Sequence, residues 1–482
     1  MGSLDAGMED SRYLRNNIPK SHRVSPFPLF PGPCEPTVTK PPADPPPTLG
    51  VVSGSLLIMA NMIGVGVFTT TGNMLSALQS VPAILLAWAL GGLAAVCGAL
   101  SYAELGAAIP RNGGEFQLLS RIYHPLLGFL AGWVALVVGF AAPLAFYAHV
   151  FGDYLSQLLP ISPLLAGTGL VVVFAVTHAL SVGQGVWVHS LATLLKLLLI
   201  LLFVGLGFLK GDPARLFSGA GPPLSAAVWQ SAFAVQLVYV SFSYSGWNAA
   251  AYLLGEFHNP QRDVPRVVLW GTGLVTLLYV ALNAAFLVAA PPDQLAGRED
   301  IARVAATHLL GEGGGKFVSL LIALGLVSTA SANLLTGPRV YEAMGRRHPR
   351  LAWLSVRRAG GGPVCAIALQ SVLALGMLVS ASFETLMAYI GVTLSLSAAT
   401  TVLGLFVLRR REPGLTRPYR VIGYPFTPLV FLLLEGWMIG HALWNQPVTA
   451  AWTVGTLLCG AVLYVVVGRE AEPSPGGSLP RD

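Results

Sequence analysis

The chain has 482 residues, of which 54% are hydrophobic and only 10% charged, with a formal net charge of +6. Soluble globular domains carry about 25% charged residues, so this chain has too few charges to cover a water-facing surface. The mean hydropathy of +0.66 supports the same conclusion. The composition therefore disfavours a soluble enzyme, a nucleic-acid-binding protein and a disordered scaffold, and it indicates an integral membrane protein.

Residues 1–48 differ from the rest of the chain because they are polar and rich in proline, as in KPPADPPPT. They contain no apolar segment followed by a cleavage site, so we expect no secretory signal peptide. The composition predicts a disordered cytoplasmic tail that serves as a linker, with an interaction role as the alternative. We expect a membrane domain over 49–468 and a second cytoplasmic tail over 469–482.

Twelve apolar runs begin at about residue 50. A membrane-spanning helix needs about 20 apolar residues, which each run can supply in whole or in large part. The predicted spans are 50–76, 81–107, 124–158, 164–182, 188–210, 226–256, 267–290, 314–342, 363–381, 385–408, 424–444 and 449–467. The third and sixth runs are longer than a span requires, so they need tilt, overhang or a break.

Basic residues give the orientation of these spans. If each run crosses once, 22 of the 28 Lys and Arg residues fall on the side of the N-terminal tail. Cytoplasmic loops carry the excess of Lys and Arg, so both termini are predicted to be cytoplasmic in a multi-pass protein of the cell membrane. Lys196 is the exception, because it lies in the middle of the fifth run.

The sequence offers no support for catalysis. Its four cysteines (Cys34, Cys97, Cys365 and Cys459) have no metal-ligand spacing, so we predict neither a zinc site nor a disulfide framework. We find no arrangement of nucleophile and base, no metal-ligand cluster and no phosphate-binding loop. We therefore expect a protein that is not an enzyme and that uses no metal or other cofactor.

Small residues interrupt two of the predicted spans. The first span contains Asn61-Met62-Ile63-Gly64-Val65-Gly66, and the sixth contains Phe242-Ser243-Tyr244-Ser245-Gly246-Trp247-Asn248. Glycine is a poor residue for a helix interior and allows another group to approach the backbone closely. Interruptions at corresponding positions of two five-helix halves predict a transporter built from inverted repeats. Close helix packing is the alternative explanation for the glycines alone.

Broken helices expose peptide groups that can bind a ligand. A second half-helix beginning near Gly64 would leave free N–H groups on Val65 and Gly66, which suit a carboxylate. Carbonyls at the end of a first half-helix can accept hydrogen bonds from an ammonium group. The candidate carbonyls are those of Met62, Ile63, Phe242 and Ser245. A carboxylate site beside an ammonium site predicts recognition of an α-amino acid.

Four motifs in order carry a family resemblance: IGVGVF, SYAELGAAIPRNGGEF, FSYSGWNAAAYLLGEFHNPQRDVPR and RPYRVIGYP. Over about residues 48–468 the chain resembles the amino acid–polyamine–organocation (APC) superfamily of permeases, and most closely its L-type amino acid transporter branch and the bacterial relatives of that branch. The resemblance implies an all-α, LeuT-like fold of twelve transmembrane helices. Five-plus-five inverted repeats, with helices 1 and 6 broken, precede two C-terminal helices, and transport proceeds by alternating access.

The same resemblance assigns roles to residues. It implies that Val65 and Gly66 donate to the carboxylate of the substrate, that Phe242 is an aromatic gate and that Asn248 lines the pocket. The carbonyls that it implies for the amine are those of Met62, Phe242 and Ser245. The chain departs from the L-type pattern in two ways, because Val65 replaces a small polar residue and the loop near 159–163 lacks a cysteine. We therefore expect no disulfide-linked heavy chain.

Lys196 is a separate candidate site. A charged lysine at the centre of a membrane helix costs about 2.5–3.5 kcal/mol, so it is either functional or a polar tie between spans. The resemblance places its ammonium where sodium-coupled relatives hold Na⁺, against a carbonyl of the first span and the hydroxyls of Ser328 and Ser331 in the eighth. We predict sodium-independent transport with Lys196 as a fixed or titrating cation, and both proton symport and exchange stay open.

The sequence thus predicts a secondary transporter of α-amino acids, with neutral side chains favoured because no carboxylate faces the predicted pocket. The alternatives are a proton-coupled symporter of cationic amino acids or polyamines, and a non-transporting sensor with the same fold. We expect the lipid bilayer and a small-molecule substrate, an amino acid, as partners, and no nucleic acid. Glu104 and Glu115, which flank the loop after the second span, are expected to form ion pairs at a cytoplasmic gate.

Overall fold

The structure is a computed structural model that describes residues 50–109, 114–180, 185–217, 221–248, 257, 259–357 and 361–467. All of these residues belong to one contact unit, 46–482. The tails predicted over 1–48 and 469–482 lie outside the described residues. Within the described part the chain is helical and forms no β-sheet; an isolated antiparallel bridge joins Arg357 and Pro363.

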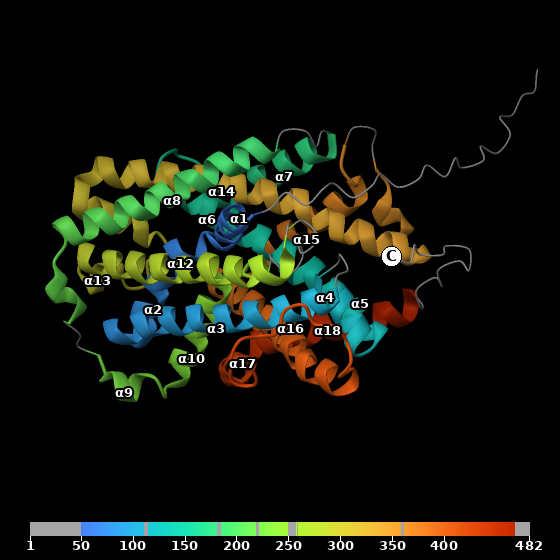
Figure 1. Ribbon diagram of the computed structural model, residues 1–482. Helices are drawn as coiled ribbons and strands as arrows, with labels where there is room; N and C mark the ends of the chain where they lie inside the picture. The colour runs from blue at the N-terminus through green and yellow to red at the C-terminus, as the bar shows by residue number, and fades with distance from the viewer. Residues whose placement is uncertain are drawn as a thin grey trace, which may run out of the picture. The chain divides into compact units, whose positions relative to one another are not determined.

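Helices follow one another along the whole described chain (Figure 1). They are α1 Val51–Met62, α2 Thr70–Leu78, α3 Val81–Ala108, α4 Gly114–Ile122, α5 Pro125–Val134, α6 Ala142–Ser156, α7 Pro163–Leu180, α8 Gly185–Lys210, α9 Leu224–Ala227, α10 Ser231–Ser243, α12 Pro260–Ala289, α13 Pro292–Leu295, α14 Ile301–Arg347, α15 Val364–Ser380, α16 Phe383–Arg411, α17 Phe426–Asn445 and α18 Pro447–Val467. A π-helical segment, Ala135–Ala141, joins α5 to α6, so the long third run is one continuous helix.

Each of the twelve predicted runs coincides with helix in the described part of the chain. Among the residues that the structure describes, eight helices are long and apolar enough to cross a membrane, and three more apolar helices are shorter. Two of the short ones, α1 and α10, belong to the spans in which we predict a break. In α14 the backbone leaves the helical region at Gly311, just before the predicted eighth span begins. The architecture is therefore that of an all-α, multi-span membrane protein.

Helix α12 packs against α3, α1 and α8, and Figure 1 shows it between α3 and α8. Two adjacent glycines of α3 make this packing close. A Cβ added at Gly92 would lie 2.2 Å from Thr276 of α12, and one at Gly91 would lie 2.5 Å from Val240 of α10. Small residues at such crossings let membrane helices approach, because dispersion contacts replace the hydrophobic effect inside lipid. These crossings fix α3 against both α10 and α12.

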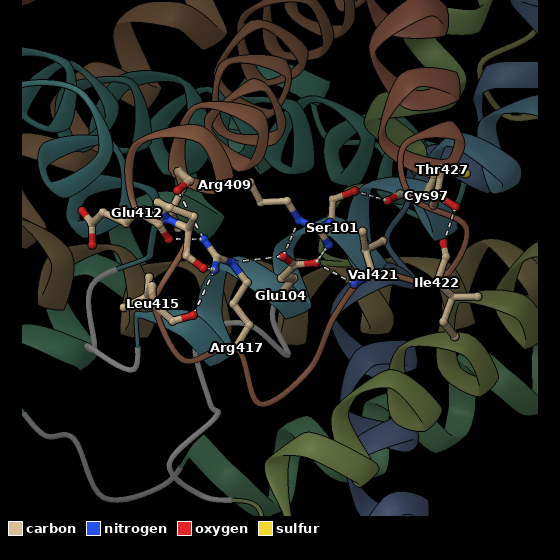
Figure 2. A network of polar contacts seen from close by, with 12 residues as sticks. Cys97, Ser101, Glu104, Arg409, Glu412, Leu415, Arg417, Val421, Ile422 and Thr427 are labelled. Atoms are coloured by element: carbon tan, nitrogen blue, oxygen red, sulfur yellow. Dashed lines mark hydrogen bonds and ion pairs between the residues drawn. The ribbon is translucent and has the colours of Figure 1, made fainter.

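Glu104 joins α3 to the segment between α16 and α17 (Figure 2). Its fully buried carboxylate accepts hydrogen bonds from Nε and Nη2 of Arg409 at 2.9 and 2.7 Å, and from the N–H of Val421 at 2.6 Å. Nε of Arg417 lies 3.7 Å from the same carboxylate. The guanidinium of Arg409 also lies 3.7 Å above the ring of Tyr424. The motif RPYRVIGYP therefore folds back onto the end of α3 and closes the bundle there.

Replacing Glu104 tests this closure. The substitution Glu104→Gln keeps the shape of the side chain but leaves two partly buried arginines without a counter-charge. We expect it to lower the free energy of unfolding by about 3 kcal/mol, because removing one partner of a buried ion pair leaves the charge of the other partner uncompensated. The measurement is the melting temperature of the purified protein in detergent.

The matched control for this prediction is Glu412→Gln. Glu412 pairs with Arg121 at 2.6 Å, but the two side chains are 30% and 48% exposed. An exposed pair contributes about 0–1 kcal/mol, so this variant should melt close to the unmodified chain. Equal melting temperatures for the two variants would contradict the role given to Glu104.

Candidate functional site

The first predicted span is interrupted between α1 and α2. Helix α1 ends at Met62, and the Gly64 N–H folds back to the Met62 carbonyl at 2.7 Å. A 3₁₀ turn over Gly66–Phe68 then leads into α2. Among the described residues the N–H groups of Val65 and Gly66 have no hydrogen-bond acceptor. The break therefore leaves two adjacent donors at the start of the second half of the span.

The sixth predicted span is interrupted after α10. Helix α10 ends at Ser243, and the Ser245 N–H donates to the carbonyl of Phe242 at 2.9 Å. Gly246 has a φ of +104°, which an L-residue with a side chain rarely adopts. Residues 249–256, where the sequence predicts the second half of this span, lie outside the described residues.

The two breaks lie against each other. A Cβ added at Gly66 would be 2.5 Å from the Ser243 hydroxyl, and one added at Gly246 would be 2.6 Å from the carbonyl oxygen of Asn61. Each glycine thus allows the backbone of one broken span to touch the other. Close approach of backbone is the property that glycine supplies here, in addition to the freedom of φ at Gly246.

Hydroxyl groups bind the peptide groups that the breaks release. The phenol of Tyr279 on α12 donates to the Met62 carbonyl at 2.8 Å and lies 3.4 Å from the Ser243 carbonyl. Thr70 donates to the Gly66 carbonyl at 2.7 Å, and its oxygen lies 3.1 Å from the Ser243 hydroxyl. The sequence reasoning missed Tyr279 and Thr70. The available signal was a tyrosine inside an apolar span, because a buried phenol needs a hydrogen-bond partner.

Tyr279 belongs to a buried aromatic cluster behind the breaks. Its ring meets Trp88 of α3 at a centroid distance of 5.6 Å and Tyr244 at 5.0 Å. The Tyr244 hydroxyl in turn bonds the Trp88 carbonyl at 2.9 Å. Aromatic side chains have few rotatable bonds, so this cluster holds the ends of α1 and α10 in place from the side of α3 and α12.

Lys196 of α8 contacts the first break directly. Its ammonium donates to the Ile63 carbonyl at 3.3 Å and to the hydroxyl of Thr329 on α14 at 2.6 Å. The Thr329 hydroxyl donates its own proton to the Gly325 carbonyl at 2.9 Å, so its oxygen is free to accept. Gly325 leaves room for the lysine stem, since a Cβ there would lie 3.4 Å from Cε of Lys196. The predicted contact between this lysine and a carbonyl of the first span is present.

The predicted hydroxyl partners of Lys196 are wrong. The structure assigns this contact to Thr329, whereas the hydroxyl of Ser331 lies 2.9 Å from Nε2 of His178 and Ser328 is buried elsewhere. The reason is helix phase. Gly325 and Thr329 are four residues apart and share the face of α14 that meets α8, and Ser328 and Ser331 lie off that face.

Two of the other predicted site residues have contacts outside the breaks. The ring of Phe242 is buried and meets Phe146 of α6 edge-on at 5.2 Å. Asn248 hydrogen bonds to Glu115 on α4, whose carboxylate also accepts from Tyr102 at 2.6 Å. Burial raises the pKa of the Glu115 carboxyl, while these hydrogen bonds act in the opposite direction. Asn248 thus links the sixth span to the loop region after α3.

Two cavities flank the broken spans. One, of about 20 Å³, is lined by Gly64, Val65, Lys196 and Thr329, together with apolar residues that include several of α8 and α14. The other, of about 550 Å³, is lined by residues such as Asn73, Gln236, Tyr239, Glu299 and Glu384. The larger cavity lies at the end of α3, α16 and α17 opposite to the Glu104 contacts, since it is lined by residues from the start of α16 and the end of α17.

Comparison with known proteins gives consistent matches. The family described as amino acid permease matches residues 49–467. The chain is 30% identical over 434 residues to the large neutral amino acids transporter small subunit 2 of Homo sapiens, covering 86% of this chain and 79% of that protein. It is 29% identical to the serine/threonine exchanger SteT of Bacillus subtilis (strain 168), covering 86% and 95%, respectively. It is 28% identical to the Asc-type amino acid transporter 1 of Mus musculus, covering 86% and 80%.

The substitution Gly246→Ala tests the contact between the breaks. A left-handed backbone costs a residue with a Cβ about 1–2 kcal/mol, and the added methyl group would also meet the Asn61 carbonyl at 2.6 Å. We expect a lower melting temperature in detergent. The control is Gly440→Ala in α17, where a Cβ meets nothing within 4 Å and alanine favours the helix. If the melting temperature of the Gly246→Ala protein equals or exceeds that of the Gly440→Ala protein, the close approach of the two broken spans is contradicted.

Proposed function

The chain belongs to the amino acid permease family, and from this membership we propose that it is a sodium-independent secondary transporter of neutral α-amino acids. The names of the similar proteins describe transport of large neutral amino acids and exchange of serine and threonine. We propose a LeuT-like arrangement of twelve crossing helices over 49–468, with both tails in the cytoplasm and the domain in the cell membrane. The meeting of two broken spans is the single observation that supports this function most.

The substrate would be held by peptide groups at the breaks. The free N–H groups of Val65 and Gly66 suit a carboxylate, because a helix start carries unpaired donors and a partial positive charge. Gly64 would let the carboxylate approach this backbone. The carbonyls of Ile63, Phe242 and Ser245 would accept from the amine, since a carbonyl oxygen has two lone pairs and can accept a second hydrogen bond. The Met62 carbonyl already accepts from the Gly64 N–H and from Tyr279, so it would accept from the amine only after one of these two bonds opens. Such contacts recognise the part that all α-amino acids share.

The walls of the site favour a neutral side chain. The cavity beside Gly64 and Val65 is lined by Lys196, so a cationic substrate side chain there would add a further positive charge to those of the lysine and of the substrate amine. The buried ring of Phe242 offers an apolar surface, and we propose that it closes over the bound substrate. Asn248 would face the substrate path when its hydrogen bond to Glu115 breaks. A cationic or polyamine substrate would lack the carboxylate partner that its charge requires.

The positions of the large cavity and of Glu104 favour alternating access. The cavity opens at one end of α3, α16 and α17, and the Glu104 contacts close the other end. We propose that this arrangement is the state open to the outside, with Glu104 in the inner gate. Transport would then require the contacts of Arg409 and Val421 with Glu104 to separate when the large cavity closes.

We further propose that the chain works without a disulfide-linked heavy chain. The human relative is named as a small subunit. In this chain the segment 157–162 between α6 and α7 contains no cysteine. A covalent link at that loop therefore has no sulfur atom to use.

Uptake into proteoliposomes tests the proposal. The full chain is reconstituted, and labelled leucine, serine, arginine and putrescine are offered with and without internal leucine, and across a pH gradient. We expect saturable uptake of the neutral amino acids. Stimulation by internal leucine would show exchange, and stimulation by the gradient would show proton symport. Uptake of arginine or putrescine alone would show the cationic alternative, and binding without flux would show a sensor.

Lys196 gives a sharper prediction. Its ammonium bonds the Ile63 carbonyl, where a bound Na⁺ would otherwise be needed to satisfy it, so replacing external Na⁺ by choline should leave uptake unchanged within about twofold. The variant Lys196→Met should lose tenfold or more of the uptake rate, because the carbonyl and Thr329 lose their donor. The control is Lys210→Met at the end of α8, which should transport normally.

Two results would count against this role. Uptake that rises steeply with Na⁺ at constant pH would exclude sodium independence. Unaltered uptake and pH dependence in Lys196→Met would show that the lysine has only a structural role, the polar contact between α8 and α14.

A further inference from the structure

Three side chains that can bind a metal ion meet at the end of α6. His149 and Asp153 lie four residues apart on one face of α6, and Glu299 lies just before α14. Nε2 of His149 is 3.4 Å from Oδ2 of Asp153 and 3.5 Å from Oε2 of Glu299. The three ligand atoms lie within 4.8 Å of one another. The sequence does not predict this cluster, because Glu299 lies 146 positions after Asp153 in the chain.

The spacing suits a shared ion better than direct pairing. Charge-assisted hydrogen bonds between nitrogen and oxygen are about 2.7–2.9 Å long, so both contacts of His149 are loose. In a tetrahedral zinc site the metal–ligand bonds of about 2.0–2.2 Å place neighbouring ligand atoms roughly 3.3–3.6 Å apart. Both distances from His149 fall in that interval. The two carboxylate oxygens lie within 4.8 Å of each other and of the His149 nitrogen, so the three atoms supply three corners of such a tetrahedron.

The charges of the cluster also favour a cation. Two carboxylates face one imidazole, and among the ion pairs of the described residues neither Asp153 nor Glu299 has a Lys or Arg partner. The neighbouring Asp300 differs, because it bonds both Arg298 and Arg303 at 2.6–3.1 Å. Arg298 and Arg303, the basic residues next to this cluster, are therefore both paired with Asp300. A divalent cation would neutralise the remaining two charges.

We propose that His149, Asp153 and Glu299 form a binding site for a divalent transition metal of the Zn²⁺ class. One nitrogen and two oxygen ligands suit Zn²⁺, whereas Ca²⁺ and Mg²⁺ prefer oxygen ligands alone. The side chains are 29%, 31% and 35% exposed, so an ion can enter from solution and keep a water molecule in the fourth position. The site joins α6 to the segment before α14.

The position of this site connects metal binding to the cavity and to the broken sixth span. Glu299 lines the large cavity. The ring of His149 contacts Phe383 of α16 at 6.0 Å, Phe383 contacts Phe146 at 5.0 Å, and Phe146 contacts Phe242 at 5.2 Å. A metal ion bound by His149 and Glu299 would fix the His149 end of this series of ring contacts to Glu299, which lines the large cavity. We infer that bound Zn²⁺ slows the closure of the cavity and therefore slows transport, an effect that rests on the proposed function.

Binding is tested on the full chain in detergent by titration calorimetry with Zn²⁺ alone. We expect one saturable site whose affinity falls at least tenfold in His149→Ala and in Glu299→Gln. Glu299 lies outside the helices, so its variant should fold normally, and an unchanged melting temperature without metal checks this. The control is His308→Ala, because His308 is an exposed histidine bonded to Gln294 at 2.6 Å and should leave binding unchanged. No saturable binding, or equal affinity in all four proteins, would overturn the site.

The effect on transport is tested separately in proteoliposomes. We expect saturating external Zn²⁺ to slow uptake several-fold in the unmodified chain and in His308→Ala, and to leave Glu299→Gln unaffected. Mg²⁺ and Ca²⁺ at the same concentration should have no such effect. Zn²⁺ binding without any change of uptake, or equal inhibition of Glu299→Gln, would overturn the effect on transport. Because the calorimetry needs no flux, failure of the site is distinguishable from failure of the proposed function.

Discussion

A peptide group inside a membrane has no water to bond with, so each interruption of a helix there requires partners from the protein. At the breaks of α1 and α10 these partners are side chains of three other helices. The carbonyls of Met62 and Ile63 bond to Tyr279 and Lys196, and the carbonyl of Gly66 bonds to Thr70. The N–H groups of Val65 and Gly66 have no acceptor among the described residues. The architecture around the breaks thus satisfies acceptors and leaves donors open, which is the asymmetry that a carboxylate needs.

The two ends of the bundle have different chemistry, and α3, α16 and α17 connect them. At one end a buried carboxylate, Glu104, holds two arginines and a backbone N–H. At the other end the polar side chains line an open cavity. Removing one partner of a buried ion pair leaves the other charge uncompensated, so separating Glu104 from its arginines is costly. Such a contact suits a gate that must be either fully shut or fully open.

The sequence predicts the features that depend on local composition. Apolar runs predict the helices, and the glycine-rich interruptions predict where α1 and α10 end. It also predicts that Lys196 needs polar partners, because a charge in an apolar helix has to be paired. The sequence cannot predict which hydroxyl pairs with it, since Ser328, Thr329 and Ser331 differ only in helix phase. Tyr279 and the group of His149, Asp153 and Glu299 were also out of reach, because their contacts join residues far apart in the chain.

Tyr279 has one hydroxyl proton and two carbonyls within reach, at 2.8 Å from Met62 and 3.4 Å from Ser243. A shift of α10 relative to α1 by a few tenths of an ångström along this line would make the two distances equal. After a further shift the hydroxyl would donate its hydrogen bond to the Ser243 carbonyl instead of the Met62 carbonyl. The phenol can therefore exchange its hydrogen bond between the end of α1 and the end of α10 as these two helices move relative to each other. Because one proton serves two carbonyls, the Tyr279 hydroxyl keeps an acceptor throughout such a rearrangement.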